Sequence, residues 1–215
     1  MTNTYLTSVG RGCNLILNLS PDWLGAVTPA VEAAYAALGA AVKCLASAPL
    51  ASAAGLVLFD EAAAPPLNNG TSVWTLPVPL AGQACGQGSS CFSLSLRLAE
   101  EMASAGQRIG AWEVAGCFAA SPPCAADGWL PLTSALPAAA ATSIGARRFV
   151  RLEAEVPGGS ARLSALRFDV LTAYAWGGAG GAKPGTPPLV LSKAELFDWS
   201  GAAACVPANC SLVAY

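Results

Sequence analysis

Cysteine is the residue type whose spacing points most directly to chemistry in this sequence. Six of its eight cysteines form three close pairs: Cys85/Cys91, Cys117/Cys124 and Cys205/Cys210. Short loops closed by such pairs are typical of disulfides formed in an oxidising compartment. A zinc site is the alternative, but it requires closely spaced Cys and His ligands; no pair has C-x2-C spacing and there is no histidine. We predict three disulfides, no metal and no cofactor, and leave open whether Cys13 and Cys44 pair.

The carboxylates show no comparable arrangement. Two carboxyl groups can share catalytic work only if both face the same substrate. Glu100 and Glu101 are adjacent, and adjacent side chains of a strand point to opposite faces, so we interpret them as part of a solvated turn. The absence of histidine excludes Ser-His and Cys-His catalysis, whereas a serine with another base stays open.

Composition argues against two classes of partner. The formal net charge is -2, from 11 Lys+Arg and 13 Asp+Glu, and no basic cluster offers a surface for nucleic acid. No stretch of about 18 residues is continuously apolar, so we predict no membrane insertion. Sequons at Asn18, Asn69 and Asn209 permit glycosylation, which agrees with a secreted protein.

The residues before Pro49 predict one strand and one helix. Asn14–Leu19 is a nearly continuous apolar run, typical of a strand buried on both faces. From Pro29 to about Ala46, apolar residues recur at steps of three and four, with Thr28 as the candidate N-cap. Such a unit cannot bury its own apolar faces, so it is interpreted as the closing step of a larger α/β structure.

After Pro49 the sequence changes to short alternating runs separated by Gly, Pro, Asn and Ser. Eight runs are candidate strands: Gly55–Phe59, Ser72–Leu76, Phe92–Leu98, Arg108–Val114, Gly128–Thr133, Arg147–Glu155, Leu163–Tyr174 and Leu189–Phe197. Strands at this spacing, without helical periods between them, indicate a β-sandwich.

Two parts of the sequence carry a resemblance to a known family. Tyr5–Asn18, with Pro21, Asp22 and Gly25 after it, resembles the segment that closes the catalytic barrel of the α-L-fucosidases, glycoside hydrolase family 29. About 90 residues further on, three stretches are similar to the C-terminal sandwich of plant-type members: Gly106–Ile109, Gly128–Trp129 and Thr142–Arg148. By this resemblance the chain is identified as the C-terminal part of a plant or algal-type α-L-fucosidase.

The resemblance implies a mainly β fold. We expect an antiparallel β-sandwich of the jelly-roll, galactose-binding-like type, preceded by the last strand and helix of a (β/α)8 barrel. Residues 1–48 would be the barrel fragment, 49–199 the sandwich and 200–215 a tail. In such a barrel the loops after the strands form the active-site face, so Asp22 and Trp23 are candidate substrate-proximal residues. The alternative is ordinary turn chemistry at Asp22, with Trp23 packed under the helix.

The implied function is hydrolysis of terminal α-L-fucosyl residues by a retaining mechanism, which uses two carboxyl groups. Both would lie upstream, so we expect no catalytic residue here and no activity from this chain alone. The implied partners are a fucosylated glycan, bound through the missing barrel, and the upstream catalytic domain itself. The expected location is extracellular, the apoplast, or a lysosome- or vacuole-like compartment, with the signal peptide upstream. The alternatives are a free-standing carbohydrate-binding sandwich without catalysis and a truncated chain without independent function.

Two further sets of residues have both a functional and a structural interpretation. The first could contact sugar or the barrel, or could bind backbone carbonyls: Gln107, Arg108, Arg147 and Arg148. The second could form a sugar-stacking platform, or could fill the sandwich core: Trp74, Trp112, Trp129, Trp176 and Trp199. We favour the structural interpretation for both sets.

Overall fold

The computed structural model describes residues 4–5, 8–9, 15–18, 20–45, 49–59, 71–86, 88–103, 106–118, 124–125, 128–132, 144–145, 147–157, 160–173 and 187–198. The elements follow in chain order: α2 (Pro29–Leu45), β1 (Ala51–Ala53), β2 (Leu56–Phe59), β3 (Thr71–Ala81), β4 (Gln83–Cys85), β5 (Ser89–Glu100), β6 (Ile109–Cys117), β7 (Trp129–Pro131), β8 (Arg148–Pro157), β9 (Arg162–Ala173) and β10 (Leu189–Asp198).

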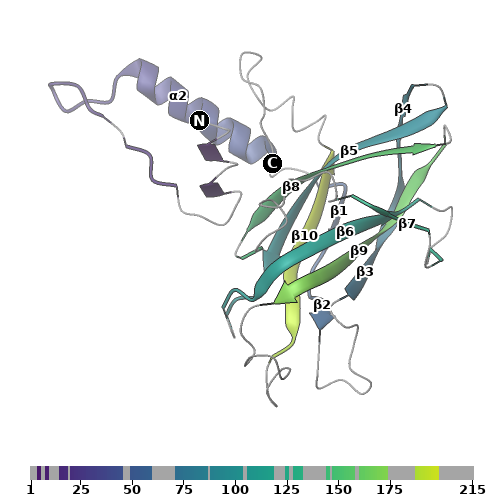
Figure 1. Cartoon of the computed structure of the whole chain (residues 1–215). Helices are drawn as coiled ribbons and strands as arrows, with labels where there is room; N and C mark the ends of the chain where they lie inside the picture. Colours follow the sequence, from purple (N-terminus) through teal and green to yellow (C-terminus); the bar gives the residue numbers. More distant parts are fainter. Residues whose placement is uncertain are drawn as a thin grey trace.

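The strands form two antiparallel sheets (Figure 1). In the six-stranded sheet, β5 and β10 pair with each other; β1 and β2 pair with β10, and β4 and β8 pair with β5. Because β8 pairs along one edge of β5 from Ser89 to Leu98, β10 and β4 share the other edge. The four-stranded sheet has the order β3-β9-β6-β7. This arrangement confirms the predicted mainly β sandwich.

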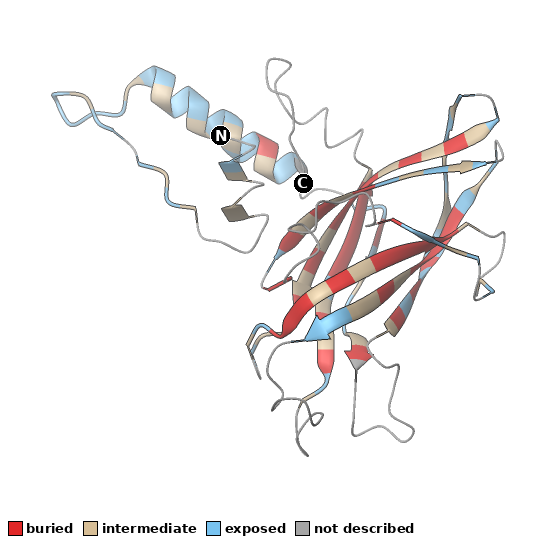
Figure 2. Cartoon of the chain, in the orientation of Figure 1, coloured by how far each residue is buried: buried red, intermediate tan, exposed pale blue. Residues whose placement is uncertain are grey.

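The core lies between the two sheets. Alternate residues of β5, Phe92 to Leu98, point inward and are buried, and Trp112 and Val114 of β6 do the same from the other sheet. The rings of Phe92 and Phe118 lie 4.8 Å apart, tilted by 56°, and join the sheets. Figure 2 shows buried positions concentrated on the strands, whereas α2 is mostly exposed. Each fully buried apolar side chain contributes about 1.5–3 kcal/mol, so the sandwich has a substantial core of its own.

All eight strands expected from the alternating runs are present, and two were not predicted. Ala51–Ala53 and Gln83–Cys85 are strands of three residues each, which is too short for an alternation to be visible in the sequence. They form because longer strands, β10 and β5, offer them an edge with which to pair.

Strand β3 is longer than expected. We predicted its end at Leu76, but it continues through Pro77 and Pro79 to Ala81. Proline cannot donate a ladder hydrogen bond, and it is therefore tolerated at sheet edges and bulges. Strand β3 is an edge strand, and its register with β9 shifts between Thr75 and Leu80, so both conditions are met.

The N-terminal segment matches the expectation in its helix but not in its strand. Helix α2 begins after Thr28, whose carbonyl accepts the N–H of Glu32 at 3.0 Å. Leu15–Asn18, within the predicted strand, belong to neither helix nor strand, and Ile16 is 91% exposed. A strand needs hydrogen bonds from a neighbour, and in the described part of the chain no strand pairs with these residues. The domain boundaries at 48/49 and 199/200 stay predictions.

Candidate functional sites

Asp22 closes the loop that precedes α2. Its Oδ1 accepts the backbone N–H groups of Leu24 and Ala26, both at 2.9 Å. Its own N–H donates to the carbonyl of Ala26 at 2.8 Å, and its carbonyl accepts the N–H of Gly25 at 3.0 Å. Gly25 has φ +78°, a conformation that glycine adopts without strain. The described contacts of Asp22 are therefore those of a turn-forming residue, and its proximity to a substrate stays a prediction.

Trp23 is presented outward by this turn. Its side chain is 90% exposed and its neighbour Leu24 is 69% exposed, so Trp23 does not pack under the helix. A tryptophan fixed on a short turn can stack on a ligand or contact a further domain. The structure brings Asp22 and Trp23 together on one loop, and no described contact assigns either residue to a substrate.

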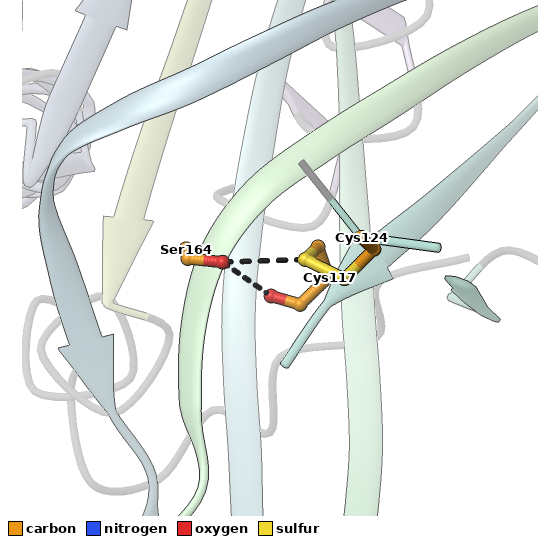
Figure 3. The surroundings of a disulfide bond; sticks show 3 residues. All are labelled: Cys117, Cys124 and Ser164. Carbon is orange, nitrogen blue, oxygen red and sulfur yellow. Dashed lines mark hydrogen bonds between the residues drawn. A yellow bond between two sulfur atoms is a disulfide. The ribbon is translucent and has the colours of Figure 1, made fainter. Parts of the chain in front are cut away.

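Two of the three predicted disulfides are present. Cys85 and Cys91 join β4 to β5 with a Cα–Cα distance of 5.7 Å, and Cys117 and Cys124 are joined at the end of β6 with 5.8 Å. The hydroxyl of Ser164 donates to the carbonyl of Cys117 at 3.2 Å beside the second bridge (Figure 3). These cysteines are bonded to each other, so the zinc alternative is wrong for both pairs.

The remaining cysteines are only partly described. Cys44 is disulfide-bonded, whereas Cys13, Cys205 and Cys210 lie outside the described residues. Within the described ranges, no group of three or more His, Cys, Asp or Glu side chains is arranged to hold a metal ion. The described disulfides agree with an oxidising compartment.

Glu100 is buried, and the prediction of a solvated turn is wrong. Its side chain is 0% exposed and that of Arg108 is 3% exposed. Glu100 Oε1 accepts the backbone N–H groups of Arg108 at 2.6 Å and Ile109 at 3.2 Å. The guanidinium of Arg108 donates to the carbonyls of Pro187 and Pro188 at 2.8 and 2.7 Å. This cluster ties the end of β5 to the start of β6 and to the segment before β10.

Electrostatics at this cluster are dominated by burial. Desolvation raises the pKa of the Glu100 carboxyl. It outweighs the backbone hydrogen bonds and the charge of Arg108, which lower the pKa. Oε2 of Glu100 is buried and has no hydrogen-bond partner among the described residues. A shifted carboxyl can signal catalysis, but here it is closed off from solvent, so we assign Glu100 a structural role. The sequence signal was the alternation Phe92, Leu94, Leu96, Leu98, which places Glu100 on the same inward face.

The two sets of ambiguous residues divide as follows. Arg108 binds backbone carbonyls, as the structural interpretation holds. Arg147 instead donates from Nη1 to the hydroxyl of Tyr5 at 3.0 Å, which is a contact with the segment that resembles the barrel. Trp74 and Trp112 are in the core, 5% and 2% exposed, but Trp129 is partly exposed on the outer face of its sheet. Trp176 and Trp199 lie outside the described residues.

A cavity of about 240 Å³ lies between β4 and β10, which pair with the same edge of β5 at Ser89–Cys91 and at Leu94–Glu100. Phe92 and Leu94 form its apolar side, and Gln83, Ser93 and Asp198 supply polar groups. Among the described residues its lining has one carboxylate, Asp198.

Surface features relevant to location are limited. In the part of the chain that the structure describes, no helix is both long and apolar enough to cross a membrane. Asn18 is exposed, whereas Asn69 and Asn209 lie outside the described residues. Glycosylation at the three sequons stays a prediction.

Comparison with known proteins gives a fold but no sequence family. The sequence matches no protein-family model and no curated protein. A candidate α-L-fucosidase from Bacteroides thetaiotaomicron VPI-5482 matches with a TM-score of 0.56 at 16% identity, covering 90% of this chain and 32% of that chain. A second candidate α-L-fucosidase, also from Bacteroides thetaiotaomicron, matches with a TM-score of 0.54 at 18% identity, covering 90% and 38%.

A third match is a glycoside hydrolase 29 family member from an unknown rumen bacterium, with a TM-score of 0.51 at 17% identity, covering 91% of this chain and 27% of that chain. At such identities the likeness establishes the fold alone. The chain spans about a third of the length of these structures.

Proposed function

We propose that this chain is the C-terminal region of an α-L-fucosidase. The observation that carries the proposal is the extent of the structural match. Residues 49–215 make up about 78% of the chain, so a match that covers 90% must include part of the N-terminal segment. A free-standing carbohydrate-binding sandwich would have no reason to share that segment with fucosidases. The resemblance of Tyr5–Asn18 to a barrel-closing segment supports the same conclusion.

In the whole enzyme, residues 1–48 would complete the catalytic barrel. Leu15–Asn18 would then find neighbouring strands to pair with, and the exposed Ile16 would become buried. The Asp22 turn would lie at the active-site face with Trp23 directed toward the substrate. The contact between Arg147 and Tyr5 would join this segment to the sandwich.

The chemistry would be supplied upstream of this chain. A retaining glycosidase needs a nucleophile and an acid/base carboxyl about 5 Å apart. We place both on the preceding barrel, where they would act on a terminal α-L-fucosyl residue of a glycan. The finer assignments are part of this proposal: a plant or algal-type enzyme, glycosylated, in an extracellular, apoplastic, lysosomal or vacuolar compartment.

The test is the coding sequence 5′ of the codon for Met1. We expect an in-frame barrel, and we expect the extended protein to hydrolyse a chromogenic α-L-fucoside with retention of configuration. Residues 1–215 alone should give no turnover. Trp23→Ala in the extended protein should raise KM or lower kcat.

Two results would contradict the proposal. One is an in-frame stop codon directly upstream of a functional start. The other is turnover by residues 1–215 alone that is abolished by replacing one of this chain's own carboxylates.

A further inference from the structure

Strand β8 forms a long edge of the six-stranded sheet. Its ten residues pair with β5 without a register shift. In the described part of the chain, no strand pairs with the other edge of β8. Alternate residues of an edge strand direct their backbone N–H and C=O groups away from the one neighbouring strand. The free edge of β8 therefore presents a regular row of hydrogen-bond donors and acceptors.

The other edge strands of the described sheets are short or interrupted. β1, β4 and β7 have three residues each, and β2 has four. β3 is longer, but it contains Pro77 and Pro79 and its register with β9 shifts between Thr75 and Leu80. Short strands, proline and bulges protect a sheet edge from pairing with another chain. Among the described edge strands, only β8 lacks all three of these features before its last residue, Pro157.

Charged side chains line the outer face of β8. Val150 and Leu152 are each 1% exposed and face the core, so the alternate residues Arg151, Glu153 and Glu155 face outward. The side chain of Arg151 is 34% exposed and that of Glu153 is 56% exposed, and the two form an ion pair within the strand. Along the chain direction, a positive charge is thus followed by a negative one on the same face.

This order of charges is complementary to itself when two copies of β8 pair antiparallel. If a two-fold axis passes through the pair at Leu152, Arg151 of each copy lies opposite Glu153 of the other. Residues that lie opposite each other share a face, so Val150 lies opposite Ala154 on the core side. All of β8 except Pro157 takes part in this register. The two copies together place four charges in alternating signs on the outer face.

The neighbouring registers are less favourable. A shift by one residue would set Leu152 opposite Arg151 or Glu153, and so place an apolar side chain on the charged face. A shift by two residues would oppose Arg151 to its own copy in one direction, and Glu153 to its own copy in the other. Like charges opposite each other destabilise a sheet; Glu113 and Asp169, opposite each other between β6 and β9, are such a pair within the chain. The charges therefore favour the register centred on Leu152.

We propose that the free edge of β8 is a dimerisation interface, on which a second copy of this chain pairs its own β8 antiparallel about Leu152. Main-chain hydrogen bonds would supply affinity, as in other cases of strand addition. Ala154 and Val156 are only partly buried where they pack against the core, and the second copy would cover them further. One pair of strands buries a small area, so the dimer is reversible and its population depends on concentration.

The dimer does not depend on the proposed fucosidase function. The N-terminal segment contacts the sandwich at Arg147, which lies before β8 and outside the paired residues. Only the sandwich contributes to the pairing, so a free-standing chain would form the same dimer. Hydrolysis of a fucoside by an extended protein would neither support nor contradict it.

The test measures the mass in solution of residues 1–215, made in an oxidising host, by sedimentation velocity at increasing protein concentration. We expect a monomer–dimer equilibrium. Its dissociation constant should rise by about tenfold or more in Arg151→Glu and in Glu153→Arg, because each reversal opposes like charges twice in the dimer. The double variant Arg151→Glu/Glu153→Arg should dimerise as the unaltered chain does, because the pairs are complementary again.

Mixing the two single variants gives the sharpest comparison. Arg151→Glu carries two acidic side chains at the paired positions, and Glu153→Arg carries two arginines. Each variant alone should be largely monomeric where the unaltered chain is dimeric, whereas an equimolar mixture should form a mixed dimer. A change of fold or of general surface charge would not produce this recovery.

Arg167→Glu is the matched control. Arg167 forms the corresponding i, i+2 pair with Asp169, and its side chain is 29% exposed. It lies on β9, which has a strand on both sides, so reversing its charge should leave dimerisation unchanged. Thermal melting of each variant checks folding. If a reversal at position 151 or 153 fails to fold, Arg151→Gln and Glu153→Gln replace it, with an expected rise in the dissociation constant of about threefold or more.

Three results would overturn the proposal. The first is a chain that stays monomeric at every concentration. The second is association that folded Arg151→Glu and Glu153→Arg leave unchanged, which would indicate contact through the exposed Ile16 and Trp23 of the N-terminal segment. The third is a mixture of the two single variants that stays as monomeric as each variant alone.

Discussion

Glu100 offers the sharpest test of the energetics of this fold. Replacing it with alanine would leave the backbone N–H groups of Arg108 and Ile109 buried without their acceptor. Each unsatisfied buried group costs about 1–3 kcal/mol. Glu100 Oε1 also lies 4.0 Å from Nε of Arg108, and removing one partner of a buried ion pair costs about 3–5 kcal/mol. A domain has about 5–15 kcal/mol of stability in total, so Glu100→Ala should lose a large part of it.

Glu100→Gln separates the charge from the hydrogen bonds, because the amide oxygen can still accept both N–H groups. Burial raises the pKa of Glu100 in the folded protein. A raised pKa in the folded protein means that the folded state binds the proton more tightly than the unfolded state. Proton binding by Glu100 therefore contributes to the free energy of unfolding. This contribution is fully present below the pKa of the unfolded state and is lost as the pH rises through the pKa of the folded state. For one proton, the free energy of unfolding cannot change by more than about 1.4 kcal/mol per pH unit.

The assay is urea unfolding of both proteins between about pH 4 and pH 8, with the free energies of unfolding subtracted at each pH. Subtraction removes the titration of every group that the two proteins share. We expect the unaltered chain to lose stability relative to Glu100→Gln as pH rises. Glu101→Gln is the matched control, since Glu101 is adjacent but less buried. If the free energy of unfolding of the unaltered chain, minus that of Glu100→Gln, is constant or rises with pH, burial does not raise the pKa of Glu100 as we infer.

Three other predictions use different parts of the molecule. Replacing Cys85 and Cys91 together by serine should lower the free energy of unfolding by about 2 kcal/mol, because the unfolded chain regains the entropy of the open loop. Intact mass before and after reduction should first show the disulfide, and free thiols at these positions would contradict it. Limited proteolysis should trim the chain to a stable core that begins near Ala51, because apolar residues before it, such as Ile16 and Trp23, are exposed and bury little apolar surface. Uniform protection of the first 48 residues in a monomer would contradict this prediction. Glu113→Gln should raise the midpoint of thermal unfolding by relieving its repulsion with Asp169, worth about 0.2–1 kcal/mol, and a lowered midpoint would show that Glu113 has a stabilising partner.

The sandwich could be predicted from the sequence because its long strands alternate. In β5, residues Phe92, Leu94, Leu96 and Leu98 all face inward, and this period of two is visible without a structure. The same period would have placed Glu100 inside, but an adjacent pair of acids suggested a turn. What the sequence could not show is that the loops around Glu100 bring backbone N–H groups to its carboxylate.

The candidate sites were harder to predict, because their partners are distant in sequence. For Asp22, turn chemistry was the alternative to a substrate-proximal role, and local context was enough to suggest it because the described contacts of Asp22 reach no further than Ala26. Thr71 contacts Asp169, and Arg167 contacts Trp129, only because β3, β9, β6 and β7 lie in that order. A tryptophan in an alternating run can face the core or solvent, and only the register of β7 against β6 decides which.

Strand β10 has a consequence for how the protein is made. It lies between β5 on one edge and β1 and β2 on the other. Ala51 of β1 therefore pairs with Leu196 of β10, although most of the sequence separates the two residues. During synthesis on the ribosome, β1, β2 and the Leu94–Glu100 part of one edge of β5 lack their strand partner until β10 emerges. Contacts of such long sequence separation slow folding, and waiting strand edges can pair with other chains. The nascent protein should therefore depend on chaperones late in translation, and a chain that stops before Leu189 should fail to close the larger sheet.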